Sequence, residues 1–139
     1  MVSGMKRGLL LFVCSGAFAF AVVGTAAADT VGSAPMLRAA ASTVITAELQ
    51  HDGSAACGKL YAPLAATIDG KTCAQRWDAR SARLLSEPGG ARRLRADLRA
   101  VATAAVTYRG PYASIALPDP LLGGKTRFYW TANCWMLMN

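Results

Sequence analysis

Few side chains in this chain could perform acid–base chemistry. The single histidine, His51, stands beside Asp52, and Asp78 directly follows Trp77 in a stretch with helical spacing. General acid–base catalysis needs such a group inside a pocket, within hydrogen-bond reach of the substrate. We take Asp78 and His51 as the catalytic candidates. For His51 the alternative is an exposed, capped helix end.

Other reaction classes lack the residues they need. No serine stands in a nucleophile elbow, and neither a Cys-x-x-Cys nor a His-Glu-x-x-His spacing occurs. The glycine pairs at 89–90 and 123–124 lack the lysine and the strand-to-helix setting of a phosphate-binding loop. We therefore expect no bound metal, no cofactor and no hydrolase of the catalytic-triad kind.

Arginines recur at helical spacing in two segments, each apolar on its other side. One stripe holds Arg76, Arg80 and Arg83, and the other holds Arg92, Arg95 and Arg99. Such faces either keep a small domain in solution or dock on an anionic partner, such as phospholipid head groups, a wall polymer or an acidic protein. Nucleic acid is not expected as a partner, because the aromatic residues lie away from these arginines.

Aromatic residues gather in the last third of the chain. In a strand, Phe128 and Trp130 would share one face and Tyr129 would take the other, which predicts a sheet that is apolar on both sides. The outer side could then pair two copies into a homodimer. If a pocket binds a small apolar ligand instead, we expect its walls to include Trp77, Tyr61, Tyr108 and Trp130.

The N-terminus has the pattern of an export signal. Lys6 and Arg7 precede an uncharged run over 8–28 that ends in three alanines. We expect residues 1–28 to be a signal peptide cleaved before Asp29, and residues 29–35 to be a short linker. The alternative is an uncleaved N-terminal anchor, because the run is nearly long enough to span a bilayer.

The composition fits one small exported domain. The chain has 139 residues, and Lys and Arg exceed Asp and Glu by seven. That surplus falls to five when Lys6 and Arg7 leave with the signal, so a basic surface survives processing. These figures exclude a multidomain enzyme, a polytopic membrane protein, a collagen-like chain and a disordered acidic tail.

Three cysteines follow the predicted signal, and an oxidising compartment allows them one bridge in any of three pairings. Cys57 with Cys73 is the favoured pair, since it ties one predicted helix to the next across a short loop. Cys134 would then be a small buried side chain in a strand. The other explanation of Cys134 is a reactive or intermolecular thiol.

Hydrophobic periodicity predicts helices in the first part of the chain and strands in the second. We expect helices over 37–51, 54–64, 73–85 and about 91–101, a hairpin of 106–108 with 112–117, and strands over 126–130 and 135–138. Helices followed by a strand meander give an α+β domain in which the helices cover one face of an antiparallel sheet.

One motif within this layout resembles a known superfamily. It is Asp52-Gly53-x-x-Ala56-Cys57-x-x-Leu60, followed by Thr72-Cys73-Ala74 and a meander that closes on Trp135. It is similar to small exported bacterial proteins of the nuclear transport factor two-like superfamily, also called SnoaL-like or cystatin-like cone. The resemblance covers 36–139 and implies helices packed in the concave side of a curved sheet.

The same superfamily hosts cyclases, isomerases, dehydratases and plain binding domains, so the resemblance does not fix the activity. We expect a secreted or envelope-located, non-catalytic binding domain that contacts a small apolar ligand or an anionic envelope component. The alternative is a cone-fold enzyme of the cyclase, isomerase or dehydratase type that uses a pocket acid as general base.

Overall fold

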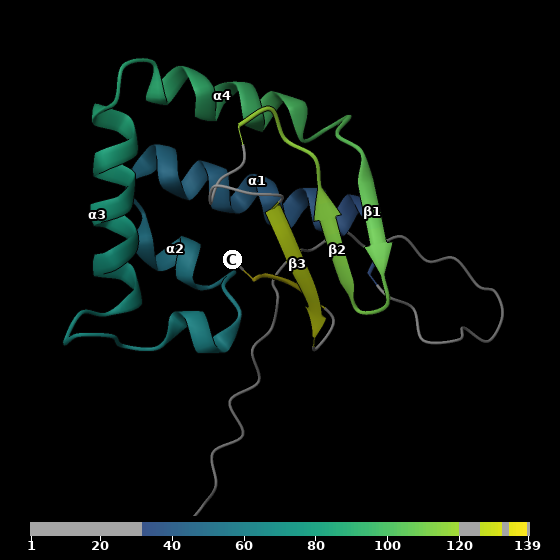
Figure 1. Cartoon of the computed structure of the whole chain (residues 1–139), viewed down its shortest axis with the longest axis horizontal. Helices are drawn as coiled ribbons and strands as arrows, with labels where there is room; N and C mark the ends of the chain where they lie inside the picture. Colours follow the sequence, from purple (N-terminus) through teal and green to yellow (C-terminus); the bar gives the residue numbers. More distant parts are fainter. Residues whose placement is uncertain (1–31, 120–125, 132–133, 139) are drawn as a thin grey trace, which may run out of the picture.

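The computed structural model describes residues 32–119, 126–131 and 134–138 of the chain. The predicted signal peptide, 1–28, lies outside these residues. The described part is a single α+β domain with a four-stranded antiparallel sheet (Figure 1). Its elements are α1 (Ala34–Gln50), α2 (Gly53–Cys57), the 3-10 turn η1 (Ala62–Ala65), α3 (Cys73–Ser86), α4 (Gly90–Ala100), β1 (Val106–Arg109), β2 (Tyr112–Ile115), β3 (Thr126–Thr131) and β4 (Cys134–Leu137).

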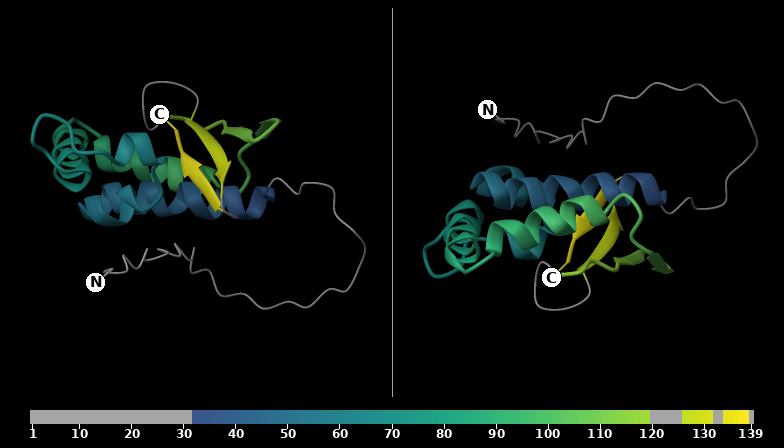
Figure 2. Two further views of the ribbon diagram at one scale, coloured as in Figure 1. Left: turned by 90° about the horizontal axis from the view of Figure 1, so that it is seen from below. Right: turned by 90° about the horizontal axis from the view of Figure 1, so that it is seen from above.

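Helix α1 lies at the centre and contacts α2, α3, α4 and β4. Figures 1 and 2 show it crossing one face of the sheet, while α3 stands at the end of the domain away from the strands. Pro35 occupies its first turn, where a missing N–H costs nothing. The helix ends at His51, whose backbone is left-handed. Its buried residues are Leu37, Ala40, Ala41, Val44, Ile45, Ala47 and Glu48.

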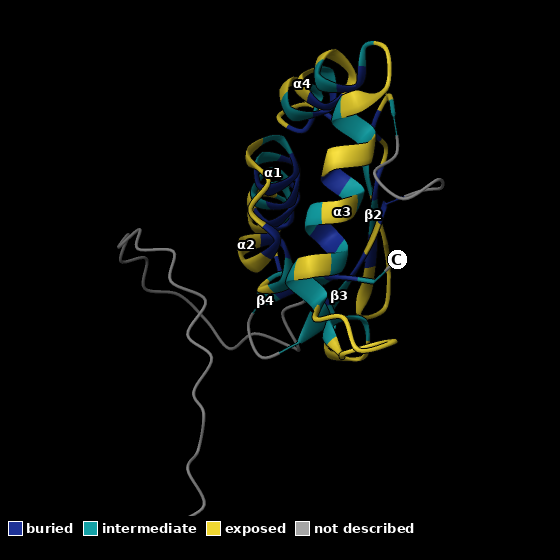
Figure 3. Ribbon diagram, turned by 90° about the vertical axis from the view of Figure 1, so that its left-hand side faces the viewer, coloured by how far each residue is buried: buried dark blue, intermediate teal, exposed yellow. Residues whose placement is uncertain are grey.

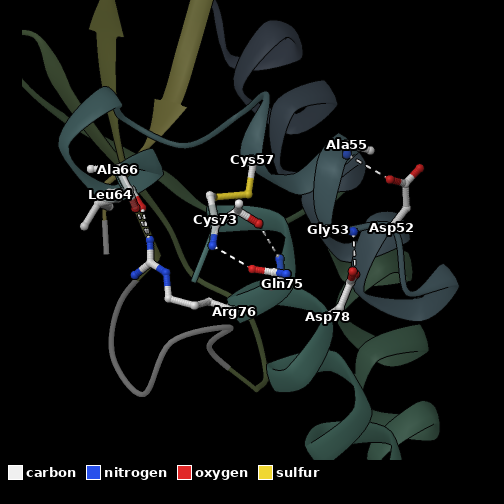
Figure 4. The surroundings of a disulfide bond; sticks show 11 residues. Asp52, Gly53, Ala55, Cys57, Leu64, Ala66, Cys73, Gln75, Arg76 and Asp78 are labelled. Atoms are coloured by element: carbon white, nitrogen blue, oxygen red, sulfur yellow. Dashed lines mark hydrogen bonds between the residues drawn. A yellow bond between two sulfur atoms is a disulfide. The ribbon is translucent and has the colours of Figure 1, made fainter. Parts of the chain in front are cut away.

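A disulfide joins the end of α2 to the start of α3 (Figure 4). Cys57 and Cys73 are 6.1 Å apart between Cα atoms, so the favoured pairing is confirmed. Close to the bridge, Thr72 and Gln75 form a capping box that starts α3. Gly53 is required where α2 meets α3, because a Cβ there would overlap the carbonyl oxygen of Ala74.

The four strands form a meander in the order β1-β2-β3-β4. Ala113 pairs with Phe128, and Phe128 pairs with Leu137, so these three side chains form one row on the face toward α1. All three are at most 1% exposed. Figure 3 shows that the buried residues line the space between helices and sheet, while exposed residues cover the outside. The predicted hairpin and the two later strands are therefore confirmed, with ends shifted by a few residues.

The predicted helix over 54–64 is wrong beyond Cys57. Residues 59–61 instead lie along the free edge of β4. Leu60 bridges Leu137 in parallel, Tyr61 N–H donates to the Leu137 carbonyl, and Leu137 N–H donates to the Lys59 carbonyl. The apolar spacing of Leu60 and Tyr61 thus reflects one side chain on each face of the sheet rather than one face of a helix.

No helix within 32–119, 126–131 or 134–138 is long and apolar enough to cross a membrane. The disulfide is compatible with export to an oxidising compartment.

Replacing both bridge cysteines, as Cys57→Ser/Cys73→Ser, should lower the free energy of unfolding by about 3 kcal/mol, because the unfolded chain loses a loop constraint of this size. Urea unfolding followed by circular dichroism measures this loss. Cys134→Ser is the control, since it leaves the bridge intact. Alkylation of Cys57 or Cys73 in the unreduced exported protein would contradict the pairing.

Candidate functional site

Charged side chains meet inside the helical part of the domain. Glu48 on α1 is fully buried, and its Oε1 accepts a hydrogen bond of 2.8 Å from Arg80 Nε on α3. Arg80 also lies over the ring of Trp77, at 5.7 Å from the ring centroid. Burial raises the pKa of Glu48, the Arg80 hydrogen bond and charge lower it, and the charge of Asp97 raises it further.

Asp97 on α4 is the second fully buried carboxylate. Its Oδ1 accepts a hydrogen bond of 2.8 Å from the Asp119 N–H, which ties α4 to the chain beyond β2. Burial is the main cause that raises the pKa of Asp97, and the hydrogen bond from Asp119 opposes it. A buried carboxyl with a raised pKa takes up a proton more readily than an exposed one.

Three buried side-chain oxygens on the helices have no hydrogen-bond partner within the described residues. They are Glu48 Oε2, Ser81 Oγ and Asp97 Oδ2. Since all three side chains are 0% exposed, no dissolved substrate reaches them. These buried groups therefore have no open face for catalysis.

The stripe of arginines predicted on α3 is largely used inside the domain. Arg76 donates from Nη2 to the carbonyls of Leu64 and Ala66, which fixes the segment around η1 (Figure 4). Arg80 is held by Glu48. Only Arg83 of this stripe is exposed and without an ion pair among the described residues.

The stripe predicted on α4 faces solvent. Arg92, Arg95 and Arg99 are exposed, and the described part of the chain offers them no carboxylate within ion-pair distance. The opposite side of α4 packs inward through Leu94. Arg93, at a different angle on the helix, reaches both Glu87 and Asp119.

The two catalytic candidates occupy structural positions. Asp78 Oδ1 accepts a hydrogen bond of 2.7 Å from the Gly53 N–H at the first residue of α2 (Figure 4). His51 is exposed and forms the left-handed end of α1. Neither residue lines the hollow on the sheet or the one between α1 and α2.

The four residues expected to line a ligand pocket lie in three places. Trp77 is a buried residue of α3, and its ring lies beside Arg80. Tyr61 packs edge-on against Tyr129, with ring centroids 5.5 Å apart, on the side of the sheet away from α1. Tyr108 and Trp130 both contact the Trp135 ring, which places them on the side toward α1. The structure brings only this last pair together.

Sequence patterns missed two arginines on the sheet. Arg109 and Arg127 lie on the face away from α1, together with Tyr112 and Ser114. Strand alternation places Arg127 and Phe128 on different faces of the sheet. Only the register of β1 and β3 against β2 shows that Arg109 and Arg127 share one face. No group of three or more His, Cys, Asp or Glu side chains suited to a metal occurs among the residues described.

The role of Asp78 as a cap can be tested directly. Asp78→Ala should lower the free energy of unfolding by about 1 to 2 kcal/mol, because it leaves the Gly53 N–H without its acceptor. Asp78→Asn keeps an acceptor oxygen and should retain most of the stability in urea unfolding. Equal losses in the two variants would contradict a capping role.

The buried carboxyls make stability depend on pH. The pKa values of Glu48 and Asp97 are raised in the folded protein, so the folded protein keeps protons that the unfolded chain has already released. The free energy of unfolding therefore falls as the pH rises from the unfolded pKa to the folded pKa. We expect the free energy of unfolding to increase as the pH falls from neutral toward the ordinary carboxyl pKa of about 4. Asp97→Asn should reduce this slope in urea titrations across pH, and an unchanged slope would refute the assignment.

No family model, curated protein or solved structure matches this chain. The function is therefore argued from its own residues.

Proposed function

We propose that this chain is an exported binding domain whose α4 docks on an anionic phospholipid surface of the cell envelope. The observation that carries the proposal is the exposed row of Arg92, Arg95 and Arg99, which lack ion-pair partners among the described residues. A charged head group near the membrane surface attracts each such cation by about 1 kcal/mol. A phosphate-rich wall polymer or an acidic protein is the other outcome of the test.

The contrast with α3 supports this choice of surface. Arg76 and Arg80 donate to the chain's own carbonyls and to Glu48, so they are not available to an outside partner. The exposed row of Arg92, Arg95 and Arg99 on α4 has no such partner among the described residues, so its N–H donors remain for a ligand. Arg83, exposed at the C-terminal turn of α3, adds to the same positive charge.

A small apolar ligand and an enzymatic role receive less support. Trp77, Tyr61 and the pair of Tyr108 with Trp130 lie apart, so they do not form one apolar pocket. Asp78 is already engaged as the acceptor for the Gly53 N–H. The α+β layout is compatible with the cystatin-like cone, and membership of that superfamily stays part of this proposal, as does the cleaved signal. A homodimer through the sheet receives less support, because Arg109 and Arg127 would bring like charges together between the two sheets.

Changing Arg95→Gln/Arg99→Gln should weaken binding to vesicles that mix phosphatidylglycerol with phosphatidylcholine by about thirtyfold at low ionic strength, since two attractions of about 1 kcal/mol are lost. Vesicle co-sedimentation against lipid concentration measures the change. Added salt should also weaken vesicle binding by the unchanged protein, because it screens the attraction between charges.

The matched control is Arg109→Gln/Arg127→Gln, which removes the same two charges from the sheet. Binding to vesicles should survive in the control. If both pairs of changes weaken binding equally, net charge alone explains it, and the α4 proposal fails. Binding that is insensitive to Arg95 and Arg99 would also refute it.

A further inference from the structure

The face of the sheet away from α1, which we call the outer face, carries a regular set of polar side chains. Thr107 pairs with Ser114, and Ser114 pairs with Arg127, so these three form one row across β1, β2 and β3. The next row begins with Arg109 opposite Tyr112. Directly opposed residues of antiparallel strands share a face, and so do residues two apart on one strand, such as Tyr112 and Ser114. All five side chains therefore project to the same side.

These five residues surround one open hollow of about 500 Å³. Arg109 and Arg127 stand on β1 and β3, on either side of β2 and two residues apart along the strand direction, so about 12 Å separates their Cα atoms. The hydroxyls of Thr107 and Ser114 lie on the same face, in the row of Arg127. One group bound over β2 would therefore lie within reach of both guanidinium groups and of the hydroxyls.

The hollow is positively charged and without an internal counter-ion in the part of the chain described. None of its lining residues is acidic, and neither arginine has an ion pair among the described residues. The nearest acid in sequence, Asp119, is held by Arg93. The segment 120–125, which connects β2 to β3, has Lys125 as its only charged residue. The charge of Arg109 and Arg127 is thus free to attract an anion.

We propose that this hollow binds the phosphate group of a small phosphate ester. Guanidinium forks and hydroxyls all donate hydrogen bonds to oxygen, and a phosphate offers more acceptor oxygens than a carboxylate, so it can engage both arginines and the hydroxyls together. The proposal is independent of the α4 surface, because it uses different residues on a different element.

The rim of the hollow also has an apolar side for the organic part of the ester. Tyr112 is 47% exposed, and its ring rests against Tyr129 at 5.3 Å between centroids. Tyr129 in turn contacts Tyr61. A ring or carbon chain attached to the phosphate would cover Tyr112, which gains binding energy that inorganic phosphate does not have.

Phenyl phosphate is the probe, and isothermal titration calorimetry of the disulfide-bonded full domain is the measurement. The unchanged protein should bind phenyl phosphate more tightly than inorganic phosphate. Arg109→Gln/Arg127→Gln should weaken the binding of phenyl phosphate by about tenfold or more. Arg95→Gln/Arg99→Gln removes the same charge from α4 and should leave this binding unchanged.

A second variant tests the site without changing its charge. Thr107→Val/Ser114→Ala removes the two hydroxyls and should weaken phenyl phosphate binding several-fold, while circular dichroism and the thermal midpoint report that the domain stays folded. This variant also decides the matter if the arginine variant fails to fold. Phosphatidylglycerol vesicles form the second arm and identify the source of the phosphate.

The outcomes separate cleanly. Loss of phenyl phosphate binding in the sheet variants alone supports a soluble ester. Loss of vesicle binding in these variants, with weak binding of phenyl phosphate, supports the same site with the phosphate supplied by a lipid head group, and it refutes the separate proposal that α4 is the docking surface. Absence of binding to both probes, or equal losses in the sheet and α4 variants, would overturn the proposal.

Discussion

The whole domain depends on the burial of α1. A chain of this size forms a single core, and every other layer is arranged so that one of its faces covers this helix. The side chains of Ala40, Ala41 and Ala47 are small, so α2, α4 and β4 can pack close to the backbone of α1. The disulfide then joins the end of α2 to the start of α3. Loosening any one layer would expose apolar surface of α1, which explains why so small a core benefits from a covalent link.

Glu48 is the exception in this apolar contact, and it determines how α3 sits. A carboxylate buried on α1 must be paired, so Arg80 is drawn inward and cannot serve the surface. Removing Arg80 would leave an uncompensated charge beside Asp97, which is more costly than the loss of one surface ion pair. The pair of Arg80 with Glu48 therefore holds α3 against α1. Asp97 makes a separate link, because its hydrogen bond from Asp119 ties α4 to the chain that leaves β2.

Local sequence patterns predicted the helices and strands that are determined by residues close together in the chain. The start of α3 at Cys73, the apolar side of α4 and the alternation in β3 all agree with the structure. The helix expected over 54–64 failed because Leu60 pairs with Leu137, a partner 77 positions away that no local period reveals. Glu48 and Asp97 were missed for a similar reason, since charged residues are expected on the surface unless their partners are known. The site on the outer face was missed because its two arginines come together only through the register of β2.

Most carboxylates are buried or already bonded within the domain, which explains why the surface is more basic than the composition suggests. Glu48 and Asp97 are buried, Asp52 and Asp78 accept hydrogen bonds from backbone N–H groups around α2, and Arg93 alone engages Glu87 and Asp119. Among the described acids this leaves Asp69, in an exposed turn with a positive φ, as the one without such a partner. The negative charges thus help to hold the fold together, whereas the row of Arg92, Arg95 and Arg99 on α4 and the two arginines of the outer face take no part in these pairs. Because the two cationic surfaces lie on separate elements and share no residue, an anionic partner at one leaves the other open. A domain built in this way can dock on a charged surface through α4 and still hold a phosphate ester on its sheet.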